Sequence, residues 1–203
     1  EAMCAIAERG RAMAEAAPPG TSTMAAVLGL SSGAVADALA GVAEVWPANF
    51  NTPTQVVIGG SVAGVDAARE RLLAAGARRV LPLNVAAAFH TPFMASAAGR
   101  LRAVLDTVPW RTPRIPVVAN VSAAPYPDGA AAPSLLERQL SSPVRWADCV
   151  ETLCRLGCDS FLELGPRRAL SGMLRELAPG AGAAVVATPE AVSAYTATAT
   201  AAP

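Results

Sequence analysis

The stretch MAAVLGLSSGAVADALAGV, residues 24–42, joins a short apolar run to a serine pair and an apolar helical pattern. Residues 24–30 predict a strand, and Ser31-Ser32 predict the cap of a helix over 33–42. The chain continues with predicted strands at 45–50 and 55–59, a helix at 65–75 and a strand at 79–85. The order β-α-β-β-α-β is that of the ferredoxin-like split unit, an antiparallel four-stranded sheet with two helices on one face.

The segments before and after this unit predict a different order of helices and strands. Residues 1–20 predict an amphipathic helix. Its pattern is typical of the interior of a helix, because no capping residue precedes it. Later segments predict a helix from Thr91-Pro92 to Val108, a doubly covered strand at 115–121, helices at 133–140, 146–156 and 169–177, and strands at 160–164 and 183–187. We therefore expect an α/β protein with a helix of the large subdomain at 1–20, a ferredoxin-like small subdomain at 21–85, the remainder of the large α/β subdomain at 86–190, and a frayed Ala/Thr tail at 191–203.

Composition excludes several classes of protein. Sixteen basic residues balance sixteen acidic ones, so no net charge attracts nucleic acid or an anionic membrane. No apolar stretch reaches the roughly 18 residues that a membrane helix needs. Four cysteines without a signal-peptide pattern favour a reducing compartment. We expect a soluble, cytoplasmic protein that binds neither nucleic acid nor membranes.

His90 is the only histidine, which excludes every multi-histidine metal site. It stands in AAAFHTP, between an apolar strand and a predicted helix N-terminus. A lone histidine is often a structural core residue. At a helix N-terminus, however, the helix dipole disfavours the imidazolium form, and a neutral imidazole is what a general base needs.

Other polar residues in apolar surroundings allow two interpretations each. Arg9 is either a surface arginine whose stem packs on apolar neighbours or a guanidinium that forks onto a substrate carboxylate. Asn49, Asn51 and Gln139 are most simply turn or capping residues. The cysteines at 149, 154 and 158 are more simply small core residues than metal ligands or nucleophiles.

Seven segments follow one another along the chain: ERGRAM (8–13), MAAVLGL (24–30), ANFNTPTQVVIGG (48–60), AFHTPFM (88–94), PVVANV (116–121), RQLSSPVRW (138–146) and FLELGP (161–166). In this order they resemble the malonyl-CoA:acyl carrier protein transacylase family, the stand-alone acyltransferases of bacterial fatty-acid synthesis. The resemblance runs to about residue 190. It implies a partial α/β-hydrolase-like acyltransferase core with an inserted ferredoxin-like β-α-β-β-α-β subdomain.

The resemblance also implies roles for individual residues. His90 would be the base that activates a serine, and the backbone carbonyl of Gln139 would fix its tautomer. Arg9 would pair with the malonyl carboxylate. The other substrate-binding positions would be Met13, Phe89, Asn49 and Asn51, and Phe89 before the histidine resembles the malonyl-type pattern rather than the methylmalonyl type. No metal or redox cofactor is implied, and the partners would be malonyl-CoA and acyl carrier protein.

One departure from the family pattern is serious. The Gly-His-Ser-x-Gly segment that carries the family's nucleophile is absent from these 203 residues. We therefore expect the serine to lie outside this chain and the chain alone to be inactive. Two alternatives stay open: a non-catalytic remnant or ferredoxin-like binding module, and a trans-acting acyltransferase of polyketide synthesis.

Overall fold

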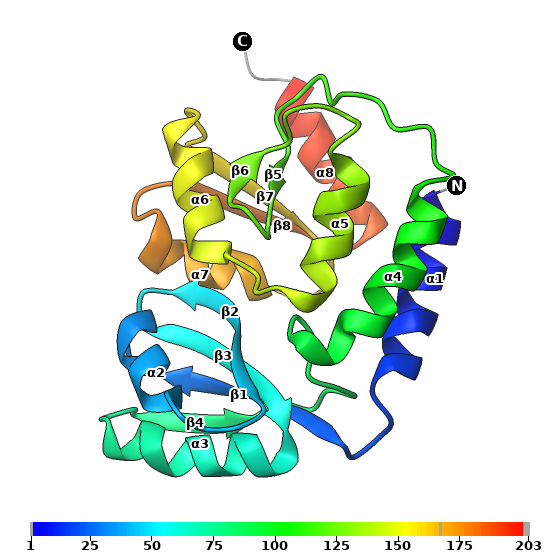
Figure 1. Cartoon of the computed structure of the whole chain (residues 1–203). Helices are drawn as coiled ribbons and strands as arrows, with labels where there is room; N and C mark the ends of the chain where they lie inside the picture. Colours follow the sequence, from blue (N-terminus) through cyan, green and yellow to red (C-terminus); the bar gives the residue numbers. More distant parts are fainter. Residues whose placement is uncertain (1, 167, 201–203) are drawn as a thin grey trace. The chain divides into compact units, whose positions relative to one another are not determined.

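The computed structural model describes residues 2–166 and 168–200 (Figure 1). It confirms an α/β protein. The chain divides into two compact units, Glu1–Cys149 and Val150–Pro203, with the division inside one helix. The segment boundaries that we expected at residues 20/21 and 85/86 stay predictions.

The first unit holds most of the secondary structure. Its elements in chain order are α1 (Ala2–Ala16), β1 (Ser22–Leu28), α2 (Ser32–Leu39), β2 (Val45–Thr52), β3 (Gln55–Ser61), α3 (Val62–Ala74), β4 (Arg79–Pro82), the 3-10 turn η1 (Pro92–Met94), α4 (Ala95–Leu105), β5 (Val118–Ala119), β6 (Ala124–Pro125) and α5 (Ala132–Ser141), followed by the start of α6 (Trp146–Arg155).

Four of these strands form one antiparallel sheet in the order β2-β3-β1-β4. In its register Ala25 faces Ile58 and Val27 faces Val56. These four side chains are buried in one core on the sheet face that packs against α2 and α3. Figure 1 shows both helices beside the sheet. Burying a valine or isoleucine side chain contributes about 1.5–3 kcal/mol, so Val27, Val56 and Ile58 in this core hold both helices on the sheet.

The opposite face of the same sheet is built from the alternate residues of the strands. Met24, Ala26, Ala48 and Val57 form a smaller cluster there, with Leu83 and Phe89 packed against it. Since side chains of a strand point alternately to the two faces, the register that buries the helix-facing core also fixes which residues face away from the helices. This second face is the floor of the site described below.

A second core of the first unit joins α1, η1, α4 and α5. Its most deeply buried members include Met94, Leu101 and Leu140. The helix expected to begin at Thr91 starts instead as η1, and α4 ends at Leu105 rather than at Val108. The indole of Trp110 donates to the Leu105 carbonyl at 2.8 Å, which satisfies a carbonyl at the helix end.

The prediction of a doubly covered strand at 115–121 is wrong. Only Val118–Ala119 is extended in a sheet, as a two-residue antiparallel pair with β6. The side chains of Ile115 and Val117 are 78% and 48% exposed. An apolar run is compatible with a parallel, covered strand, but no described strand lies alongside this one in parallel.

The second unit contains the rest of α6, followed by β7 (Ser160–Leu164), α7 (Ala169–Leu177), β8 (Gly182–Val186) and α8 (Pro189–Thr200). β7 and β8 pair in parallel, with Phe161 opposite Ala183. The Ala/Thr stretch that we expected to be frayed is helical through Thr200, because alanine favours helix and the Thr188 hydroxyl accepts from the Ala191 amide. Residues 201–203 of that expectation lie outside the described residues.

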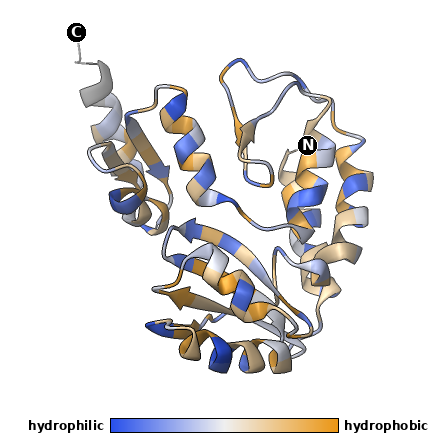
Figure 2. Cartoon of the chain, turned by 60° about the vertical axis from the view of Figure 1, so that its left-hand side comes forward, coloured by the Kyte–Doolittle hydropathy of each residue, from blue (hydrophilic) through white to orange (hydrophobic). Residues whose placement is uncertain are grey.

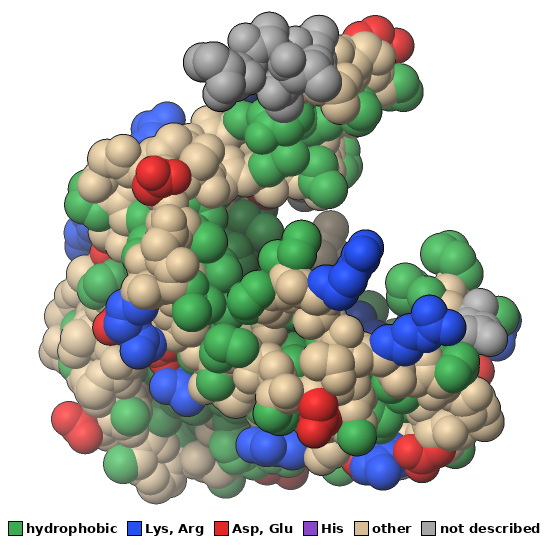
Figure 3. Space-filling model, turned by 90° about the horizontal axis from the view of Figure 1, so that it is seen from above, with side chains coloured by type: hydrophobic (Ala, Val, Ile, Leu, Met, Phe, Trp, Pro, Cys, Tyr) green, Lys and Arg blue, Asp and Glu red, His purple; other side chains and the backbone are tan. Residues whose placement is uncertain are grey.

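None of the described helices combines the length and apolarity needed to span a membrane, and polar and apolar residues are mixed along the helices in Figure 2. On the face drawn in Figure 3, basic and acidic side chains are interspersed among hydrophobic and uncharged ones. This distribution agrees with the zero formal net charge of the sequence.

Candidate active site

A cavity of about 480 Å³ in the first unit contains six of the seven predicted site residues. The six are Arg9, Met13, Asn49, Asn51, Phe89 and His90. Apolar side chains of Met24, Val57, Leu83 and Val85 complete its lining. The seventh predicted residue, Gln139, does not line the cavity but contacts His90 from α5.

Local structure explains why these residues meet. Arg9 and Met13 are four residues apart on α1 and therefore share a helix face. Asn49 and Asn51 both line the cavity from β2, at a place where the pairing of β2 with β3 shifts register between Pro47 and Asn49 and again between Phe50 and Thr52. Met24 and Val57 come from the sheet face that the helices α2 and α3 leave free.

His90 has an unusual backbone conformation. Its φ angle is +60°, in the left-handed region that a residue with a Cβ atom enters at a cost of roughly 1–2 kcal/mol. Hydrogen bonds hold the turn in place. Ser22 Oγ on β1 accepts from the Ala88 amide at 3.0 Å, and Thr91 Oγ1 donates to the Ala88 carbonyl at 2.6 Å. Ser22 and Thr91 are both buried, so this turn is fixed from two sides.

The orientation of the imidazole follows from one hydrogen bond. His90 Nδ1 lies 2.8 Å from the backbone carbonyl oxygen of Gln139. A carbonyl oxygen only accepts, so Nδ1 carries the proton and donates it, and Nε2 keeps its lone pair. That carbonyl is free because residue 143, the position whose amide would bond it in a continued helix, is Pro143 and has no N–H.

The electrostatics of the cavity favour a neutral imidazole. Burial lowers the pKa of His90 below its ordinary value of 6.5, and the positive charge of Arg9 lowers the pKa further. The hydrogen bond to the Gln139 carbonyl acts in the opposite direction and raises the pKa, but less than burial lowers it. His90 is thus unprotonated at neutral pH, as a general base requires.

Arg9 is the positively charged side chain of the cavity that can bind a ligand. Its side chain is half-buried and takes part in none of the hydrogen bonds or ion pairs of the described residues. The neighbouring charges of α1 are engaged elsewhere: Glu8 and Glu15 both pair with Arg100 on α4. A half-buried guanidinium without a partner, in a cavity with a neutral imidazole, is suited to bind a carboxylate by its planar fork.

Sequence reasoning missed one support of the site and one motif elsewhere in the first unit. Ser22 supports the His90 turn from 66 residues away, and no local pattern signals it. The loose motif Gly29-Leu30-Ser31-Ser32-Gly33 also fits G-x-S-x-G at a strand-to-helix junction, and sequence analysis passed over it. In the structure Ser31 is an exposed helix cap with relaxed φ and ψ of −69° and 158°, accepts from the Ala34 amide and does not line the cavity. It is not a strained nucleophile elbow.

Neither the cysteines nor the FLELGP loop lines this cavity. The expectation that Cys149, Cys154 and Cys158 are core residues is confirmed for Cys149 and wrong for Cys154 and Cys158, which are exposed. Burial raises the pKa of the Cys149 thiol to about 11, which makes it a poor nucleophile. Glu163 accepts from the amides of Leu170 and Ser171 and so caps α7, and these bonds lower its pKa. Among residues 2–166 and 168–200, no three His, Cys, Asp or Glu side chains are grouped to hold a metal ion.

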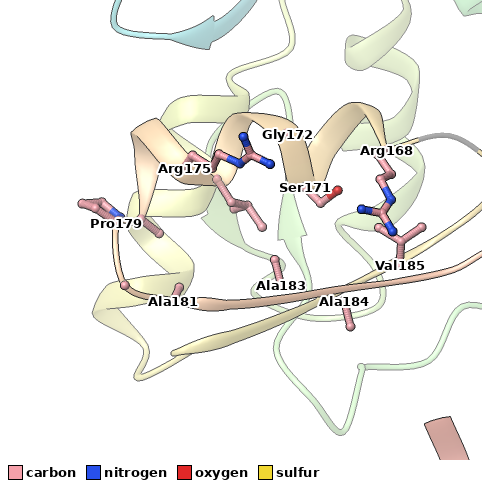
Figure 4. Close-up of a pocket in the computed structure, with 12 residues that line it drawn as sticks. Arg168, Ser171, Gly172, Arg175, Pro179, Ala181, Ala183, Ala184 and Val185 are labelled. Carbon is pink, nitrogen blue, oxygen red and sulfur yellow. The ribbon is translucent and has the colours of Figure 1, made fainter.

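A second cavity, of about 700 Å³, lies beside α7 and β8 in the second unit (Figure 4). Its polar lining comes from Arg168, Ser171 and Arg175. None of the described residues that line this cavity is a histidine, an aspartate or a glutamate. Its described lining therefore offers cations but no general base.

Comparison with known proteins assigns the chain to a family. The model of the acyl transferase domain matches residues 1–189. The chain belongs to the acyl transferase domain family. Within the family it is similar to the malonyl CoA-acyl carrier protein transacylase of Escherichia coli K12, with 37% identity over 197 residues that cover 96% of this chain and 64% of the relative. The relative from Bacillus subtilis is 36% identical over 95% of this chain and 62% of its own length.

Solved acyl transferases have the same fold. An acyl carrier protein S-malonyltransferase from Vibrio cholerae superimposes with a TM-score of 0.91 and 36% identity, over 96% of this chain and 64% of that one. A malonyl-transacylase solved in complex with a type II PKS acyl-carrier protein gives a TM-score of 0.87 and 38% identity, over 93% and 62% of the two chains. The chain thus spans a little under two thirds of the length of the relatives that it matches.

Proposed function

We propose that this chain supplies the base and the carboxylate-binding half of a malonyl-CoA:acyl carrier protein transacylase. The observation that carries the proposal is the pairing, in one cavity, of a neutral imidazole held by the Gln139 carbonyl with an unpartnered Arg9. The serine nucleophile is proposed to lie outside these 203 residues, because the sequence has no Gly-His-Ser-x-Gly segment and Ser31 is only a helix cap.

The proposed reaction has two half-steps. His90 Nε2 takes the proton of the serine hydroxyl while the serine oxygen attacks the thioester carbonyl of malonyl-CoA. The tetrahedral intermediate collapses, the C–S bond breaks, and the imidazolium returns the proton to the departing CoA thiolate. In the second half-step, His90 takes the proton of the phosphopantetheine thiol of the carrier protein, and the sulfur attacks the ester carbonyl of malonyl-serine. The ester C–O bond then breaks, and the imidazolium returns the proton to the serine oxygen, which leaves both groups ready for another cycle.

The remaining cavity residues are proposed to select the acyl group. The guanidinium of Arg9 would fork onto the free carboxylate of malonyl, and Met13 and Phe89 would bound the space beside it. Asn49 and Asn51 would contact the thioester arm from β2. A bulkier α-substituent would have to displace Phe89, which packs against two clusters of buried side chains.

The finer description of the fold is also a proposal. We assign the β2-β3-β1-β4 sheet with α2 and α3 to an inserted ferredoxin-like subdomain, supported by its antiparallel order and β-α-β-β-α-β sequence. We assign the other elements to part of an α/β-hydrolase-like core. The proposed partners are malonyl-CoA and acyl carrier protein of fatty-acid or polyketide synthesis. We propose no metal or redox cofactor, and we place the protein in the cytoplasm because its four cysteines are unpaired.

Labelled malonyl-CoA tests the proposal. Incubated with this chain alone, it should leave no stable covalent label. Reading the coding DNA upstream of the first codon should show an in-frame Gly-His-Ser-x-Gly, and the polypeptide extended to include it should become labelled and pass the label to carrier protein. In the extended polypeptide His90→Ala should abolish transfer. Stable label on the 203-residue chain, or a stop codon directly upstream, would contradict the proposal and favour a non-catalytic remnant.

A further inference from the structure

The side chain of Gln139 makes contacts that its backbone role does not require. Its Nε2 donates to the Ser142 carbonyl at 3.0 Å and reaches the Pro143 carbonyl at 3.4 Å. We propose that the side-chain amide of Gln139 is a positioning group, which folds the end of α5 so that the Gln139 carbonyl points at His90 Nδ1 and selects its tautomer. This inference deepens the proposed function and rests on it for its biological meaning.

The carbonyl needs such a support because the helix no longer provides one. α5 ends at Ser141, and Pro143 cannot donate an N–H back to the Gln139 carbonyl. The last carbonyls of a helix are free to tilt and to bond water instead. A fixed turn after the helix is therefore what keeps this carbonyl aligned with the imidazole at 2.8 Å.

The orientation of the amide is determined by its surroundings. Two carbonyl oxygens face Nε2, so exchanging the amide oxygen and nitrogen would bring carbonyl oxygens against one another. Nε2 is also 3.5 Å from His90 Nδ1, but Nδ1 already donates its proton to the Gln139 carbonyl and cannot accept from the amide. The amide thus acts on the imidazole through the turn and not by a direct bond.

The same turn is attached to the strand that carries the two cavity asparagines. The Val144 amide donates to the Ala48 carbonyl at 2.9 Å, and the Phe50 amide donates to the Val144 carbonyl at 2.8 Å. These bonds form a parallel bridge between Val144 and Asn49. The Gln139 amide therefore connects the acceptor of the imidazole to β2, so that the base and the strand lining its cavity are held in one arrangement.

The single histidine makes the proposal directly testable. In the ¹⁵N-labelled 203-residue chain, the two imidazole nitrogen resonances report the tautomer of His90 alone. Gln139→Met keeps the length of the side chain and the backbone carbonyl but removes the amide. We expect the ratio of the Nδ1–H to the Nε2–H tautomer to fall about fivefold, which corresponds to losing a hydrogen bond of about 1 kcal/mol. Arg138→Met, at the exposed neighbouring position, should leave the ratio unchanged.

An unchanged tautomer ratio in a folded Gln139→Met chain would overturn the proposal, even if the melting temperature falls. Should this variant fail to fold, the unsubstituted chain decides the question. Gln55 is the only other glutamine in the sequence and serves as an internal reference. The side-chain amide protons of Gln139 should exchange with water more slowly than those of Gln55, and equally fast exchange would overturn the proposal. Neither the tautomer ratio nor the amide exchange depends on acyl transfer, so a failure of this proposal can be told apart from a failure of the proposed function.

Discussion

The substitution Ser22→Ala removes the only hydroxyl that accepts from the Ala88 amide, at a site where the serine is 5% exposed. Leaving a buried N–H without an acceptor costs about 1–3 kcal/mol. For a chain of this size, each kcal/mol lowers Tm by about 2–4 °C, so we expect a loss of roughly 2–12 °C. The left-handed backbone of His90 loses one of its supports at the same time.

The assay for this prediction combines thermal unfolding with an NMR titration of His90. Because burial is the largest cause of the lowered pKa of His90, a loosened turn that admits water should move that pKa up toward 6.5. Ser31→Ala is the matched control, since it also removes a serine hydroxyl that accepts one backbone amide, but at an exposed cap of α2. The control should lose about 0.5–2 kcal/mol and leave the pKa of His90 unchanged.

The reasoning would be refuted by a folded Ser22→Ala chain in which the His90 resonances and the pKa stay as they are. It would equally be refuted if Ser31→Ala moved the pKa of His90 as much as Ser22→Ala does. The first result would mean that the Ala88 bond does not hold the turn. The second would mean that any loss of stability alters the site.

Three further predictions concern the pH response, a thiol and a glycine. The pKa of His90 in the folded chain lies below 6.5, so on acidification the unfolded chain takes up this proton first. The contribution of His90 to the free energy of unfolding, measured by urea unfolding, should therefore be constant above about pH 6.5 and be lost as the pH falls through the folded-state pKa. Cys149, with a pKa of about 11, should resist iodoacetamide at pH 8 while the exposed Cys154 is alkylated, and equal rates would contradict the burial. Gly60→Ala should prevent folding, because the new Cβ would lie 2.0 Å from the Glu44 carbonyl oxygen, and a normal circular dichroism spectrum would show otherwise.

Much of the sheet subdomain was predictable because its signals are local. Apolar runs, the serine cap at Ser31 and the turn residues between them indicate the strands and helices of residues 22–82 without reference to distant contacts, although the helix expected at 65–75 begins earlier, at Val62. The prediction of a covered strand at residues 115–121 failed for the opposite reason. Their apolar composition is compatible with a covered strand, but only neighbours distant in sequence decide whether a strand is covered.

In the candidate site, too, some features could be predicted from the sequence and others depend on distant contacts. The positions of Arg9, Met13, Asn49, Asn51, Phe89 and His90 came from an ordered resemblance to a family, and the structure brings these six into one cavity. The residues alone favoured His90 as a base because of its place before a predicted helix, left two interpretations open for Arg9, and gave Asn49 and Asn51 only ordinary turn or capping roles. The support of Ser22 and the bond from His90 to the Gln139 carbonyl join residues 66 and 49 positions apart, and the left-handed φ of His90 is a backbone angle, so no local sequence pattern encodes them.

The central claim is that Arg9 and His90 form one cavity that recognises a carboxylate-bearing acyl thioester. Its most direct test is to titrate the 203-residue chain with malonyl-CoA and with acetyl-CoA while following the His90 resonances, in parallel with an Arg9→Met chain. A charge-assisted pair is worth about 2–3 kcal/mol, so we predict that malonyl-CoA binds roughly 30- to 150-fold more tightly than acetyl-CoA and that Arg9→Met removes this difference. Equal affinity for the two thioesters, or a malonyl preference that survives Arg9→Met, would contradict the account.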